Sequence, residues 1–132
     1  MNPTLSIPVP QSKIRTVLLT DAVFSATGGL LFLLARQPLG EFLGVSPAVM
    51  AVLIAVQFGF AALIASQLAR PTISRGFVAF TMIGNSAWVL ASLLLLTLPA
   101  FNFSTEARWA IAVVAVCVDA LATLQFLEWR KM

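Results

Sequence analysis

The chain has 132 residues, of which 60% are hydrophobic, and its 8 basic and 5 acidic side chains give a net charge of +3. Soluble domains carry about 25% charged residues, and so short a chain has too little interior to hide this much apolar surface from water. The sequence contains no histidine, which excludes His-ligated haem or zinc and any Ser-His or Cys-His catalytic pair. Composition therefore indicates one membrane domain without an evident catalytic set.

Residues 1–12 contain three prolines and no charged side chain, so we expect a flexible N-terminal arm. Residues 13–132 form the predicted transmembrane domain. Lipid offers no hydrogen-bond partners to the backbone, so apolar runs of about 20 residues cross its ~30 Å core as helices. Four runs meet this requirement, at residues 16–35, 49–68, 76–98 and 109–127.

The connections between these runs carry helix-capping residues. Ser46 precedes Pro47, Ser74 precedes the third run, and Ser104 or Thr105 can cap the fourth. Connections this short join antiparallel neighbours. The prediction is an all-α membrane protein with four helices in an up-down-up-down bundle.

Basic side chains flank the runs unevenly. Arg36 and Arg108 fall on one side of the membrane, and six others fall on the opposite side: Lys13, Arg15, Arg70, Arg75, Arg130 and Lys131. Because basic flanks stay in the cytoplasm, both termini are predicted to be cytoplasmic. Short basic clusters between apolar runs fit contact with membrane lipid and give no face for nucleic acid.

The first and third runs resemble each other, as do the second and fourth. Aligning Asp21 with Asn85 also pairs Phe24 with Trp88. Residues 62–67, Ala-Leu-Ile-Ala-Ser-Gln, resemble residues 120–125, Ala-Leu-Ala-Thr-Leu-Gln. The chain therefore reads as two similar helical hairpins in the same orientation.

Each run contains an amide or carboxylate side chain between the cytoplasmic boundary and the middle of the membrane. These four residues are Asp21, Gln57, Asn85 and Asp119. At ~1.5 Å per residue they lie about 8–16 Å from the cytoplasmic boundary, so inward-facing side chains would meet in one polar cluster. Helical spacing places four further residues beside it, as cavity or packing residues: Ser25, Gly28, Trp88 and Ser92.

The polar cluster has a functional and a structural interpretation. An ionisable residue costs about 2.5–3.5 kcal/mol at the centre of a span, which makes it a functional candidate by default. Asp21 and Asp119 would then handle a proton or a cation, with Asn85 and Gln57 as partners. Alternatively, Asp119 bonds Asn85, and an arginine near the inner surface holds Asp21: Arg15, Arg75 or Arg130.

Several of these residues also lie in motifs that resemble those of other proteins. Leu18, Leu19, Asp21 and Ala22 begin the first run, and the other shared residues are Thr27-Gly28, Arg70-Pro71 and the set Asn85, Trp88, Ala91, Ser92 and Leu93. With these motifs the chain resembles a group of small bacterial inner-membrane proteins without an assigned activity. The resemblance implies four helices and a bacterial inner (plasma) membrane, and it supplies no chemistry. It also implies an amide in the fourth helix, where this chain has Asp119.

Three functions stay open at this point. The first is a non-catalytic bundle that acts through helix contacts, as a homo-oligomer or as an accessory subunit of a larger complex. Its support is a stripe of small residues, Ala51, Ala55 and Gly59, at four-residue spacing. The second is a small proton-coupled transporter that uses Asp21 or Asp119. The third is a binder of a lipid-like molecule, such as a quinone or pigment, near Trp88. The residues indicate no metal and no cofactor.

Overall fold

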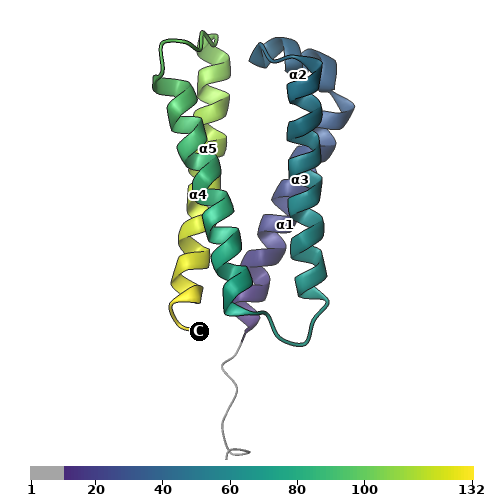
Figure 1. Ribbon diagram of the computed structural model, residues 1–132, viewed down its shortest axis with the longest axis vertical. Coiled ribbons are helices and arrows are strands. Elements are labelled where there is room, and N and C mark those ends of the chain that lie inside the picture. The colour runs from purple at the N-terminus through teal and green to yellow at the C-terminus, as the bar shows by residue number, and fades with distance from the viewer. Residues whose placement is uncertain (1–10) are drawn as a thin grey trace, which may run out of the picture.

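The computed structural model describes residues 11–132, which are helical apart from short connections. Its five helices are α1 (Ser12–Leu34), α2 (Arg36–Leu43), α3 (Pro47–Leu68), α4 (Arg75–Thr97) and α5 (Thr105–Trp129) (Figure 1). All except α2 are long and apolar enough to cross a membrane. The fold is therefore an all-α bundle of four membrane-span-like helices, which confirms the predicted class.

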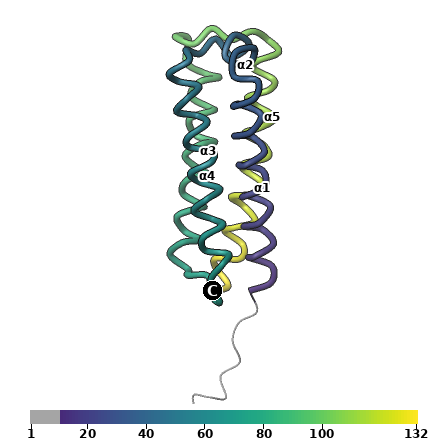
Figure 2. The backbone as a smooth tube through the Cα atoms, turned by 90° about the vertical axis from the view of Figure 1, so that its right-hand side faces the viewer, coloured from purple at the N-terminus to yellow at the C-terminus, as the bar shows by residue number. Residues whose placement is uncertain are grey.

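The four long helices form two antiparallel hairpins. Helix α1 packs along α3, and α4 packs along α5. The main backbone contact between the two hairpins is that of α1 with α5. Figure 1 shows the hairpins closest where the chain ends, and farther apart toward the end that carries α2. Figure 2, turned by 90°, shows the long helices running nearly parallel over their full length. The two hairpins match the predicted internal repeat.

Apolar side chains cover the outside of this bundle. Leu34, Ile83 and Val116 are each at least two-thirds exposed. By contrast, six polar or charged side chains are buried: Asp21, Ser25, Thr81, Asn85, Ser92 and Gln125. This distribution, apolar outside and polar inside, is stable in lipid, where buried polar groups satisfy one another and the hydrocarbon contacts only apolar surface.

Serine side chains begin three of the helices, as predicted. The hydroxyl oxygens of Ser46, Ser74 and Ser104 accept hydrogen bonds from backbone N–H groups three residues later, over 3.1–3.2 Å. Each bond satisfies one N–H group that the helix itself leaves without a partner.

The start of α1 is tied to the connection between α3 and α4. Arg15 donates to the carbonyl oxygens of Leu68, Arg70 and Pro71 over 2.7–3.0 Å. The Gln11 side chain exchanges two hydrogen bonds with the backbone of Ile73. Gln11 and Ser12, assigned to the flexible arm by the sequence, therefore belong to the bundle, while residues 1–10 of that arm lie outside the described residues.

Helix α2 is an element that the hydrophobic pattern did not predict. It is an eight-residue helix in the long connection between the first two spans. It ends at Gly44, whose φ of 69° is the left-handed conformation that glycine adopts without steric cost. The matching connection of the second hairpin contains no helix, so α2 distinguishes the two repeats.

The close contact between α1 and α3 forms at glycine residues of α1. A Cβ atom at Gly29 would lie 3.2 Å from Gln57 Cβ and 3.3 Å from the ring of Phe58. The small-residue stripe of α3, Ala51, Ala55 and Gly59, is exposed instead. Ala51 and Ala55 line a hollow that α3 forms with the end of α1 and with α2.

Candidate functional site

Asp21 lies inside the bundle, about 14 Å along α1 from Ser12 at ~1.5 Å per residue. Its side chain is 1% exposed. It shares a face of α1 with the buried residues Ile14, Leu18 and Ser25, which are spaced by three or four residues and therefore point the same way. Helical geometry thus places a carboxylate at the contact between the two hairpins.

Two amide side chains from the other hairpin bind one oxygen of this carboxylate. Asn85 Nδ2, on α4, donates to Asp21 Oδ2 over 2.7 Å, and Gln125 Nε2, on α5, donates to the same oxygen over 2.5 Å. Asn85 Nδ2 also donates to Gln125 Oε1 over 3.0 Å. Asp21, Asn85 and Gln125, which we call the polar triad, therefore form a closed triangle that links α1, α4 and α5.

The second carboxylate oxygen is far less engaged. Ser25 Oγ, one turn along α1, lies 3.5 Å from Asp21 Oδ1, at the outer limit of hydrogen bonding. Oδ2 has two short bonds, so the carboxylate is asymmetric. Oδ1 is the atom that can accept a further proton or ligand.

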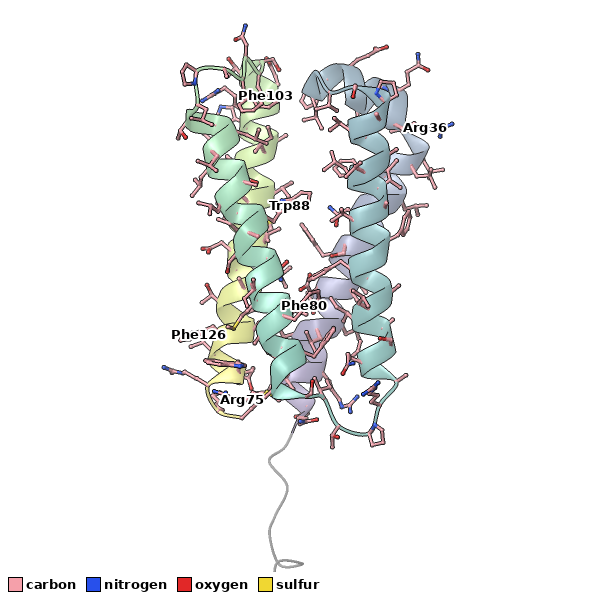
Figure 3. The ribbon with its side chains drawn as sticks, in the orientation of Figure 1. Arg36, Arg75, Phe80, Trp88, Phe103 and Phe126 are labelled. Carbon is pink, nitrogen blue, oxygen red and sulfur yellow. The ribbon has the colours of Figure 1, made fainter. Side chains whose placement is uncertain are left out.

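No basic side chain within residues 11–132 pairs with Asp21. The ion pair of the described residues joins Lys131 to Glu128 at 3.2 Å. Arg15 is occupied by backbone carbonyl groups, and the Arg75 guanidinium lies 3.9 Å from the centre of the Trp129 ring (Figure 3). The alternative in which Arg15, Arg75 or Arg130 holds Asp21 is therefore wrong, and the amide groups of Asn85 and Gln125 bind the carboxylate instead.

A cavity of about 130 Å³ adjoins the polar triad between the hairpins. Its polar lining comes from Asp21, Ser25, Gln57 and Asn85. Three aromatic residues complete much of the wall: Phe24, Phe60 and Trp88. Figure 3 shows Trp88 projecting from α4 toward the other hairpin. At about 30 Å³ per water molecule, the space holds roughly four waters or one small solute.

The structure brings most of the predicted site residues to this place. Asp21 and Asn85 bond each other, and Ser25, Gln57 and Trp88 line the cavity. Gln57 makes no hydrogen bond to Asp21 within the described residues; a Cβ atom on Gly28 would lie 3.5 Å from its Nε2 atom. Ser92 is buried but donates to the Trp88 carbonyl of its own helix, so it packs apart from the triad.

Asp119 does not belong to the cluster, and the prediction that it faces inward is wrong. Its side chain is exposed on the outside of α5. The buried face of α5 contains Ala115, Val118, Ala122 and Gln125, at spacings of three or four residues. Asp119 follows Val118 directly, and one helical step of about 100° turns it away from that face.

Gln125 is the member of the polar triad that the sequence analysis missed as a site residue. It is fully buried at 0% exposure. Two signals could have identified it: its spacing from Ala115, Val118 and Ala122, and its alignment with Gln67 in the internal repeat. It was missed because polarity alone favoured the carboxylate at position 119.

A second and larger hollow lies at the opposite end of the first hairpin. It has a volume of about 780 Å³ and is lined by the end of α1, by α2 and by the start of α3. Arg36, Gln37 and Glu41 contribute its polar rim. Figure 3 shows Arg36 pointing away from the bundle at this end. Neither Trp88 nor a residue of the polar triad lines this hollow, although its lining reaches Ala55 and the smaller cavity begins at Val56.

Within residues 11–132, no three His, Cys, Asp or Glu side chains are close enough to share a metal ion. Comparisons with protein-family models, curated proteins and solved structures give no match to this chain. The function is therefore inferred from the chemistry of the polar triad and its cavity.

Proposed function

We propose that this protein is a small proton-coupled transporter that exchanges a proton for a small solute at Asp21. The observation that carries the proposal is a buried carboxylate with one satisfied oxygen and one nearly free oxygen, beside a cavity between two hairpins. Of the two carboxylates named from the sequence, Asp21 alone has this setting, because Asp119 is exposed on the outer surface.

The asymmetry of the hydrogen bonds supports exchange at one atom. The amides of Asn85 and Gln125 fix Oδ2 and hold the carboxylate in place, while Oδ1 keeps only the long contact to Ser25. A proton on Oδ1 and a solute bound to Oδ1 would compete for the same lone pairs. Competition for one group is the simplest physical basis for coupling two fluxes.

The arrangement of the hairpins supports movement around this site. The triad joins α1 of one hairpin to α4 and α5 of the other, so any change at Asp21 acts on the contact between them. Backbone contacts within each hairpin are much more extensive than those between the hairpins. Two units with a small mutual contact and a shared binding site are the kind of arrangement that a ligand can shift between states.

Cavity size weighs against the lipid-like ligand at this position. Pockets for drug-sized ligands usually measure about 300–1,000 Å³, whereas this cavity measures about 130 Å³. A quinone or pigment ring system would have to displace several walls. The hollow of about 780 Å³ beside α2 has a suitable size, but it lacks the triad and Trp88.

Vesicles that contain the purified protein and carry a pH gradient test the proposal. We expect uptake of at least one solute, from a panel of anionic, neutral and cationic small molecules, to depend on the gradient. Asp21→Asn should abolish this uptake, because it retains the shape and removes the titratable group. Asp119→Asn is the matched control and should transport normally. The proposal would be overturned if uptake of every solute in the panel were independent of the pH gradient, or if Asp21→Asn took up solute as well as the wild type.

Association with other membrane helices is a second candidate. The exposed stripe Ala51, Ala55 and Gly59 on α3 is the specific observation in its favour, because small residues let helices approach closely in lipid. Native mass spectrometry from gentle detergent would show a homo-oligomer or a co-purifying subunit. Replacing Ala55 by a bulky leucine should then dissociate it, and a monomer under all conditions would contradict this candidate.

The transport proposal includes a bacterial inner membrane with both chain ends on the cytoplasmic side. It is supported by the uneven distribution of basic side chains, including Arg15 and Arg75 at the end where α1 begins. In a Cys117→Ala background, a single cysteine is introduced in place of Thr72 or of Asn102. Labelling each variant from either side of the membrane shows on which side that position lies. Cytoplasmic labelling at position 102 would reverse the orientation.

A further inference from the structure

Among residues 11–132, the polar atoms at the cavity with unused hydrogen-bonding capacity are Asp21 Oδ1, Asn85 Oδ1 and the Gln57 amide, and the Asp21 carboxylate is the one charged group. Both hydrogens of Asn85 Nδ2 are used, one toward Asp21 and one toward Gln125, while its Oδ1 atom accepts no bond from residues 11–132. Asp21 Oδ1 keeps only its contact to Ser25. A wall with unused acceptors and with a carboxylate as its one charged group attracts a cation or a strong hydrogen-bond donor and repels anions.

Aromatic rings supply the rest of the recognition surface. Phe24 comes from α1, Phe60 from α3 and Trp88 from α4, so three helices each place one ring at the cavity. A cation close to the face of an aromatic ring is attracted by the ring's quadrupole, most strongly for tryptophan. Rings and a carboxylate together are the chemistry that recognises alkylated ammonium groups.

The wall distinguishes organic from inorganic cations. Ca²⁺ takes six to eight oxygen ligands, and Mg²⁺ demands a near-octahedral set. Here the side-chain oxygens come from four residues, Asp21, Ser25, Gln57 and Asn85, and the remaining wall is apolar or aromatic. A strongly hydrated ion would lose more water contacts than this wall replaces. An alkylammonium ion buries its methyl groups against the rings and needs fewer oxygen partners.

Volume limits the size of the ion. A cavity of about 130 Å³ corresponds to roughly four water molecules. An ammonium group with a few carbon atoms fills it, whereas a flat polycyclic cation would extend beyond its walls. Gly84 also belongs to this wall, and a Cβ atom there would lie 3.2 Å from the Phe60 ring, so the small residue leaves room for the ring at the cavity.

We propose that the cavity binds a small organic cation, of the alkylammonium class, between Asp21 Oδ1 and the rings of Phe24, Phe60 and Trp88. This inference rests on the proposed transport function and names its substrate class. The cation occupies the site in place of the proton on Asp21, so one proton is released for each cation bound. Charge at the site is thereby conserved between the two states.

Calorimetric titration of the protein in lipid nanodiscs, with proton release followed in two buffers, tests the proposal. The probes are tert-butylammonium, its neutral counterpart tert-butanol, sodium and acetate. We expect saturable binding of tert-butylammonium alone, with release of one proton. Asp21→Asn should eliminate the proton release. Comparable affinity for tert-butanol, sodium or acetate would overturn the substrate class.

Variants of Trp88 separate recognition from folding. Trp88→Leu should weaken tert-butylammonium binding about 5- to 30-fold, because it removes the ring that holds cations best, and Trp88→Phe should weaken it less. Trp109→Leu is the control, since Trp109 is 69% exposed on the outside of α5. If Trp88→Leu does not fold, the affinity of Trp88→Phe for tert-butylammonium, relative to wild type, decides whether the ring contributes to binding. Unchanged affinity in Trp88→Phe and Trp88→Leu would overturn the aromatic contribution.

The transport assay distinguishes the proposed transport function from the proposed substrate class. If vesicles show pH-driven exchange of a neutral, anionic or inorganic solute, the transport function stands and the organic-cation class is wrong. If no solute exchanges with protons yet tert-butylammonium binds with proton release, the site is correct and the transport function is wrong.

Discussion

Gln125 and Gln67 occupy equivalent positions in α5 and α3, at the same distance from the serine that caps each helix, yet only Gln125 reaches Asp21. Gln125 Nε2 donates to Asp21 Oδ2, whereas Gln67 Oε1 is buried without a hydrogen-bond partner among residues 11–132. The internal repeat is therefore symmetric in sequence position and asymmetric in bonding.

This asymmetry predicts opposite effects for one substitution at the two positions. Gln125→Leu removes two triad hydrogen bonds and should destabilise the bundle, since hydrogen bonds between membrane helices contribute about 0.6 kcal/mol on average and about 1.7 kcal/mol at most. Gln67→Leu removes a buried oxygen that has no partner and should be neutral or stabilising. Reversible unfolding in mixed micelles measures both, and a larger loss for Gln67→Leu would contradict the assignment.

Asp119 should be dispensable for the fold. Its carboxylate faces outward on α5, so Asp119→Leu exchanges a charge near the middle of a span for an apolar side chain. On insertion scales the apparent free energy of inserting this helix should fall by up to about 3 kcal/mol. A membrane-insertion assay on the isolated α5 segment measures this change, and the full-length variant should unfold no more easily than wild type. Marked destabilisation would indicate a contact that the bundle itself does not show.

Gly29 lies at a tight contact between α1 and α3. A Cβ atom there would lie 3.2 Å from Gln57 Cβ and 3.3 Å from the Phe58 ring, so Gly29→Ala requires these neighbours to shift by a few tenths of an ångström and should cost about 1–2 kcal/mol. Gly59→Ala is the matched control on α3, because no atom lies within 4 Å of the added Cβ position. The control should be neutral or gain up to about 1 kcal/mol through helix propensity. Thermal unfolding of the two variants compares them directly, and equal midpoints would refute the close approach.

Arg15 should hold the connection between α3 and α4 through its forked guanidinium group. It donates to three carbonyl groups, those of Leu68, Arg70 and Pro71. Arg15→Lys keeps the charge that orients the protein but loses the planar fork, so it should not rescue the contact. Hydrogen exchange of the amides near Ile73 should become faster in Arg15→Lys and Arg15→Gln alike. Lys13→Gln is the control, and protection as in wild type for Arg15→Lys would show that charge alone suffices.

The candidate site could be predicted only in part, for a geometric reason. Asp21 and Asn85 were found because each is the most polar residue of its span and because they align in the repeat. Asp119 was chosen over Gln125 because a carboxylate is the stronger signal in sequence, although one helical step of about 100° decides which residue faces inward. The arginine partners proposed for Asp21 were wrong because Arg15 and Arg75 bind backbone and ring groups at the end of the bundle.

By itself the sequence determined the four long helices, the serine caps of α3, α4 and α5, and the antiparallel order, because run length, hydropathy and capping residues are local properties of the chain. It also determined that a carboxylate and amides lie within the membrane. Only the tertiary structure decided which of them meet, which oxygen of Asp21 stays nearly free, and that three aromatic residues line the same cavity as Asp21. Those facts depend on helix rotation and on packing between hairpins, and neither is encoded in any single segment of the chain.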